Sequence, residues 1–120
     1  MIEEFKQVED ETGLGLRWTI GNALEVLWDD AWFDELVALV QDESFGRARE
    51  MVVLGLGKSR ETAAGEVLVG LLGDPAVNGH AVKALRKLKV PEARSALQHM
   101  LGDERAWVRV EAKRALDALT

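Results

Sequence analysis

Gly57, Lys58 and Ser59 have the residue types that end a phosphate-binding loop, in which backbone amides and a lysine hold nucleotide phosphates. Such a loop also needs a glycine five positions before Gly57, and Val52 stands there. Without that glycine the backbone amides cannot curl around a phosphate. We therefore predict the end of a helix instead, with Gly57 supplying a left-handed turn and Lys58 meeting the negative end of the helix dipole.

Ser95 and His99 are the other pair that could do chemistry, because residues four apart on a helix face can touch and a histidine can activate a hydroxyl. No orienting carboxylate is apparent beside them, so we expect His99 to be an ordinary exposed residue. The absence of cysteine from the sequence excludes disulfides, thiolate metal sites and cysteine nucleophiles. We expect no catalytic residue, no metal site and no cofactor.

The elements that carry these residues belong to an internal repeat. Arg17, Arg47, Asn78 and Arg109 stand 30, 31 and 31 positions apart, and two apolar columns keep nearly the same spacing: Ala23, Val53, Ala84 and Ala115, then Leu24, Leu54, Leu85 and Leu116. An interleaved second pattern ends in Asp42, Asp74 and Asp103. In both patterns apolar residues recur three and four apart, which indicates amphipathic helices and not strands.

Helix boundaries follow from the capping residues. Asp74 is predicted as an N-cap with Pro75 in the first helical position, and Pro91 opens a later helix in the same way. The predicted helices are 2–11, 16–28, 31–41, 44–57, 61–72, 76–88, 91–101 and 104–119. We predict one all-α domain over residues 1–120, with a cap helix in 1–13, repeats at 14–43, 44–74 and 75–103, and a terminal half repeat at 104–120.

Three segments carry a resemblance to a known family: WVRVEAKRALDAL (107–119), VNGHAVKALRKL (77–88) and ARSALQHMLGD (93–103). They resemble the HEAT-like repeats of the phycobilisome-lyase type, over about residues 14–120. The resemblance implies a right-handed α-solenoid of antiparallel helix pairs, about three and a half repeats long, whose second helices line a concave face. It says little about function, because this repeat serves many unrelated proteins.

The charge is negative and uneven. The 120 residues include 21 acidic and 15 basic side chains, a net charge of −6 that argues against nucleic acid as a partner. Residues 1–44 hold twelve acidic and two basic side chains, whereas residues 45–120 hold nine and thirteen. We find no apolar run long enough to span a bilayer and no secretory leader pattern, and therefore expect a cytoplasmic protein.

The stacking of helix pairs predicts a partner-binding surface on the exposed stripe of the second helices. Its residues are Asp34, Val37, Ala38, Gln41, Glu66, Val69, Gly70, Ser95, Gln98 and His99. This stripe is mixed and slightly acidic, which suits a protein or peptide with basic side chains better than a phosphate backbone. Gly70 either deepens a groove or reflects weak constraint at an exposed position. We expect a non-enzymatic scaffold for protein–protein interaction.

Several features keep alternatives open. Trp18, Trp28, Trp32 and Phe33 either fill an irregular end of the core or form a recognition patch for cationic groups. Two other functions compete with the scaffold: holding a chromophore as an accessory in the phycobilin-lyase manner, which the resemblance suggests, and phosphate-backbone binding by basic rear patches around Lys58, Arg86 and Arg109.

Two further expectations concern packing. We interpret Gly79 as allowing two helices to approach closely, and we interpret Asp42, Asp74 and Asp103 with Arg47 and Arg109 as a structural ladder between repeats. The last half repeat is predicted to leave Val108, Leu116 and Leu119 uncovered on one side. This open C-terminal end is a second candidate surface, for a larger partner or for a homo-oligomer.

Overall fold

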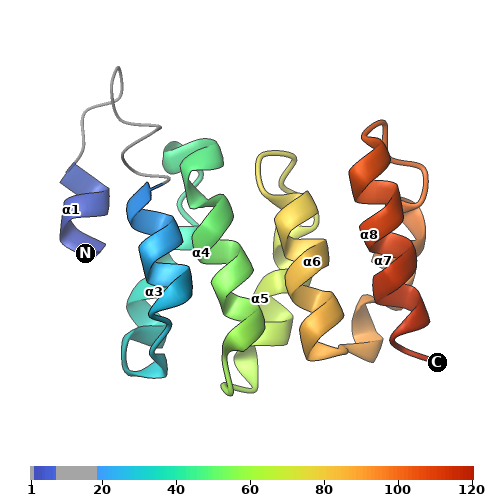
Figure 1. Ribbon diagram of the computed structural model, residues 1–120, viewed down its shortest axis with the longest axis horizontal. Coiled ribbons are helices and arrows are strands. Elements are labelled where there is room, and N and C mark those ends of the chain that lie inside the picture. Colours follow the sequence, from blue (N-terminus) through green and yellow to red (C-terminus); the bar gives the residue numbers. More distant parts are fainter. Residues whose placement is uncertain (1, 8–18) are drawn as a thin grey trace.

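The computed structural model describes residues 2–7 and 19–120, and every regular element in these ranges is helical (Figure 1). The elements are α1 (Ile2–Gln7), a helical segment over 19–26, α3 (Phe33–Val40), α4 (Glu50–Gly55), α5 (Ala63–Leu71), α6 (Asn78–Leu88), α7 (Arg94–Met100) and α8 (Ala106–Asp117). Short 3-10 turns cover Asp30–Trp32, Glu43–Arg49, Leu56–Lys58 and Pro91–Ala93. The all-α prediction is confirmed. The predicted end of the first helix and start of the second, together with Arg17 and Trp18, lie outside the described residues.

Helix starts are displaced from their predicted positions. Asp74 does not cap α6 directly: its Oδ1 accepts the Ala76 N–H at 3.0 Å, and the helix begins at Asn78 after Val77. The same turn recurs along the chain, with the Ser44 N–H donated to Asp42 at 3.0 Å and the Arg105 N–H donated to Asp103 at 2.8 Å. A short carboxylate that binds the amide two residues onward closes a turn of its own, so each helix starts later. Pro91 does open its short 3-10 helix, as predicted.

Helix α6 lies at the centre of the packing. Its main contacts are with α4, α5 and α8, and α8 also packs on α7. In Figure 1, α4, α6 and α8 stand side by side, with α5 and α7 behind them. The fully buried core runs through this arrangement and includes Leu36, Val53, Leu56, Val82, Leu85, Leu97 and Val108. Each buried leucine or valine contributes about 1.5–3 kcal/mol of stability through removal of apolar area from water.

Two glycines permit the close crossings of α6. A Cβ on Gly57 would lie 3.1 Å from the Ala84 Cα, so this glycine gives α6 room to pass. The predicted left-handed turn at Gly57 is wrong, because within the described residues positive φ occurs at Gly46 and Lys89. The prediction for Gly79 is confirmed: a Cβ there would collide with the Trp107 ring and lie 3.0 Å from the Val108 Cγ2. The close contact between α6 and α8 therefore requires a residue without a side chain at position 79.

Candidate functional site

The segment that resembles a phosphate loop binds carboxylates of its own chain. Lys58 Nζ lies 2.8 Å from a Glu25 carboxylate oxygen and donates to the Glu25 carbonyl at 3.0 Å. The Ser59 hydroxyl donates to Asp30 Oδ1 at 2.7 Å, and the Arg60 N–H donates to Asp30 Oδ2 at 2.9 Å. Both hydrogen bonds lower the pKa of the Asp30 carboxyl, and the hydrogen bond from Ser59 has the larger effect. The donors that would hold a phosphate thus join this segment to residues 25–30.

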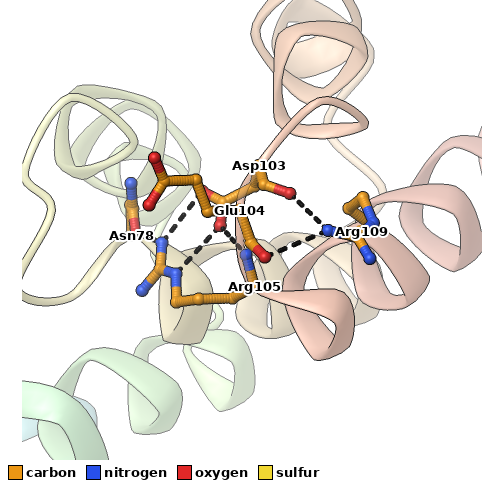
Figure 2. Close-up of polar contacts among 5 residues, drawn as sticks. All are labelled: Asn78, Asp103, Glu104, Arg105 and Arg109. Atoms are coloured by element: carbon orange, nitrogen blue, oxygen red, sulfur yellow. Dashed lines mark hydrogen bonds and ion pairs between the residues drawn. The ribbon is translucent and has the colours of Figure 1, made fainter.

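The predicted ladder of aspartates and arginines exists in altered form at the turn before α8 (Figure 2). Asp103 pairs with Arg105, whose Nε lies 2.9 Å from Oδ1, and this hydrogen bond lowers the pKa of Asp103 to about 2. Arg105 Nη2 also donates to Asn78 Oδ1 at 2.5 Å and so connects α8 to α6. Arg109 donates instead to the backbone carbonyls of Asp103 and Glu104, at 2.7 and 3.1 Å. Asn78, which interrupts the arginine column in the sequence, is an acceptor in this link.

At the turn before α6, the prediction that Arg47 belongs to the ladder is wrong. Arg47 is exposed and binds Glu50, with Nε 2.7 Å from Oε1. The partner of Asp74 is Arg49, whose Nη1 lies 2.8 Å from Asp74 Oδ2. Arg49 is 1% exposed and its guanidinium also donates to the Gly46 and Val40 carbonyls. These contacts are structural, as the ladder was expected to be.

His80 is the more enclosed of the two histidines. Its Nε2 lies 3.3 Å from Glu50 Oε2, and its ring meets the Trp107 ring edge-on with 5.5 Å between centroids. Burial lowers the pKa of His80 from its ordinary value of 6.5, and the positive charge of Lys83 acts in the same direction. Ser95 and His99 are both exposed on α7, so the exposure expected of His99 is confirmed, although His99 lines neither hollow described below.

The predicted partner-binding surface is exposed over most of its length. Val37 and Val69 are half-buried against the core, while the remaining residues are exposed: Asp34, Ala38, Gln41, Glu66, Gly70, Ser95, Gln98 and His99. Gln41, Glu66 and Gly70 line a shallow hollow of about 340 Å³ between the end of α3 and α5. Glu66 and Val69 line a second hollow of about 610 Å³, whose other wall is the turn between α6 and α7. The α7 residues line neither hollow.

A cleft that the sequence pattern does not predict lies between α1, the segment 19–26 and the start of α3. We call it the acidic end cleft; its volume is about 470 Å³ and its lining is Ile2, Glu3, Glu4, Leu24, Leu27, Asp29, Trp32 and Glu35. The rings of the aromatic cluster differ in burial. Trp28 and Phe33 are half-buried against the core, with Trp28 lying over Gly55, whereas Trp32 is 46% exposed in the cleft.

The outer side of α8 is the second exposed apolar surface. We call it the α8 outer face; it is a hollow of about 480 Å³ lined by Leu101, Arg109, Val110, Lys113, Arg114 and Asp117. The predicted uncovered residues are wrong in part. Val108 is fully buried against α6, and Leu116 and Leu119 are half-buried. Of the two valines in α8, Val110 is the exposed one, at 49%.

The chain matches no protein-family model, no curated protein and no solved structure. Within residues 2–7 and 19–120, no group of three or more His, Asp or Glu side chains is placed to hold a metal ion. In the same residues, no helix has both the length and the apolar character needed to cross a membrane.

Proposed function

We propose that this chain is a non-enzymatic scaffold of HEAT-like repeats, which binds a protein or peptide partner along the exposed surface of α3, α5 and α7. In this proposal the helix pairs form a right-handed solenoid and these three helices line its concave side. One observation carries the proposal: Glu66 lines both hollows, so that they meet along α5 at a shared carboxylate.

The lining of the two hollows favours a partner with basic and apolar side chains. Glu43 and Glu66 face the smaller hollow beside Val67 and Leu71. The larger hollow adds further carboxylates and the apolar residues Val69, Leu88 and Val90, together with the cations Arg60 and Lys89. Carboxylates beside apolar side chains are suited to bind lysine or arginine side chains of an extended peptide.

The basic rear patches are less suited to a phosphate backbone than their sequence indicates. Lys58 is bound to Glu25, and Arg105 to Asp103. Arg86 and Arg114 both approach the buried Glu111, at 3.1 and 3.2 Å. Cations that are paired within the chain release fewer counterions from a nucleic acid, so the expected affinity is low.

The test is an NMR titration with two pools of unstructured decapeptides, matched in length and leucine content, one rich in lysine and arginine and the other in aspartate and glutamate. We expect the basic pool to shift amide resonances of α3 and α5, and Glu66→Lys to abolish these shifts. Glu104→Lys, which changes the same charge at an exposed residue of the α7–α8 turn, is the matched control and should leave them intact.

Three results would contradict the proposal. The first is that neither peptide pool shifts the amide resonances of α3 and α5. The second is that the shifts fall on α8 instead. The third is that Glu104→Lys and Glu66→Lys weaken peptide binding equally. Titration with a bilin, followed by visible absorbance, and with single-stranded DNA at several salt concentrations tests the two competing functions. Saturable binding of either at this surface, with no response to the basic pool, would replace the scaffold by that function.

A further inference from the structure

The exposed apolar side chains of this protein are concentrated at its two ends. Within the described residues the large exposed apolar side chains are Val26, Leu27, Trp32, Leu101, Trp107 and Val110. Four of these six line the acidic end cleft or the α8 outer face. The two surfaces lie at opposite ends of the longest dimension, which is 41 Å (Figure 1). Such hydrophobic patches rimmed by charged groups are typical of protein interfaces.

The charges at the two surfaces are complementary. The lining of the acidic end cleft includes the carboxylates of Glu3, Asp29 and Glu35, and no lysine or arginine. The α8 outer face has three cationic residues, Arg109, Lys113 and Arg114, of which Arg114 is paired with the buried Glu111, against the single carboxylate of Asp117. Opposite potentials at two apolar surfaces favour their association and fix its orientation.

The side chains also complement one another in kind. Trp32 is 46% exposed among carboxylates, and an exposed indole attracts an ammonium or guanidinium group over its ring. On the α8 outer face, Lys113 and Arg114 project beside Val110, so one surface supplies both an apolar and a cationic side chain. A tryptophan at the centre of an interface is among the residues that contribute most to affinity.

We propose that a second copy of this chain is the occupant of the acidic end cleft, which binds the α8 outer face of that copy. The contact joins two different surfaces, so it is head to tail, and each added copy leaves one cleft and one α8 outer face free. The chain therefore assembles into rows, with the two hollows that meet at Glu66 left uncovered in every copy. This assembly uses other surfaces than the proposed peptide site and does not depend on it.

The experiment measures mass by sedimentation equilibrium over a wide range of protein concentrations. For the wild type we expect the mean mass to rise with concentration and to pass that of a dimer. Glu35→Lys in the cleft, and separately Lys113→Glu on α8, should each raise the dissociation constant about tenfold or more. Both residues are exposed, and circular dichroism checks that each variant keeps its helices. Raising the salt concentration should weaken the assembly, because exposed charges are screened.

A mixture of the two variants gives the decisive result. The Glu35→Lys chain keeps its α8 outer face and the Lys113→Glu chain keeps its cleft, so the mixture should form one-to-one dimers at concentrations at which each variant alone is monomeric. Glu61→Lys and Lys87→Glu change the same charges at exposed residues outside both surfaces and should leave association unchanged. A wild type that is monomeric at every concentration, or a mixture that stays monomeric while the wild type associates, overturns the proposal.

Discussion

Arg49 Nη1 lies 2.8 Å from Asp74 Oδ2 and joins the start of α4 to the turn that precedes α6. The guanidinium is 1% exposed, and it donates further hydrogen bonds to the Gly46 and Val40 carbonyls at 2.7 and 2.8 Å. One side chain therefore connects the end of α3, the turn before α4 and the turn before α6. Removing a single partner from a buried ion pair leaves the other charge uncompensated, which is more costly than losing an exposed pair.

Replacing this arginine should destabilise the fold strongly. We expect Arg49→Met to lower the free energy of unfolding by about 3–5 kcal/mol, measured by urea denaturation. Arg49→Lys should not restore it, because an ammonium group cannot reach acceptors in several directions as the planar guanidinium does. Arg47→Met is the matched control; the Arg47 side chain is 73% exposed, so its pair with the buried Glu50 should be worth only about 0–1 kcal/mol. Equal losses for Arg47→Met and Arg49→Met would contradict this account of the ladder.

Two glycines should respond to alanine in opposite directions. Gly79→Ala places a methyl group against the Trp107 ring and Val108, and we expect a loss of about 1–3 kcal/mol from overpacking. Gly70→Ala on α5 meets no atom within 4 Å, so the better helix propensity of alanine should add about 0.5–1 kcal/mol. Thermal unfolding of both variants checks this. An increase in stability for both variants would show that α8 can shift to accept the methyl group without loss of stability.

Acid should weaken the protein partly through His80. Burial lowers the pKa of the folded His80 below 6.5, so near that pH the unfolded chain binds a proton that the folded chain does not. Stability is therefore retained above about pH 6.5 and falls as the pH drops toward the folded pKa. His80→Gln should flatten the dependence of the unfolding midpoint on pH in this window. His99→Gln, at an exposed position, is the control. If it flattens the pH dependence of the unfolding midpoint equally, the effect does not come from His80.

The end of α6 carries a strained residue. Lys89 adopts the left-handed conformation, with φ 54° and ψ 63°, at the position after the helix that glycine usually occupies. Lys89→Gly should relieve this strain and raise stability by about 0.5–1 kcal/mol, after the greater freedom of glycine in the unfolded chain is subtracted. Lys89→Ala keeps the strain and loses the charge, so it should bring no gain. Equal melting temperatures for the glycine and alanine variants would contradict the argument.

The helices could be predicted from the sequence because each buries one stripe of its own residues. Over α4 and the turns at its two ends, the side chains with at most 2% exposure are at positions 48, 49, 52, 53 and 56, and their spacing of three and four is the pattern of an amphipathic helix. Position 49 belongs to that stripe, so the same spacing identifies Arg49 as the buried arginine. The repeat position that Arg47 and Arg109 share favours Arg47 instead, which is exposed. The repeats are aligned by residue type and not by the face of the helix.

The surfaces could be predicted to different extents. Eight of the ten predicted partner-binding residues are exposed, because the stripe opposite a buried stripe faces outward whatever the neighbouring helices do. The acidic end cleft could not be predicted in this way. It brings Ile2 and Glu3 of α1 beside Leu24 and beside Trp32, and their proximity depends on how three segments pack and not on the period of any one of them.

The central position of α6 affects the folding of the chain and its local unfolding. Its main contacts are with α4, α5 and α8, which are near neighbours in sequence, so the loops that must close during folding are short. A topology of this kind folds quickly for its size. Protection against amide hydrogen exchange should then be greatest in α6 and decline toward both ends, where the segments that line the acidic end cleft and the α8 outer face open first. The two end surfaces would be the least protected parts of the described chain, and contact with another molecule there would slow exchange across several helices at once.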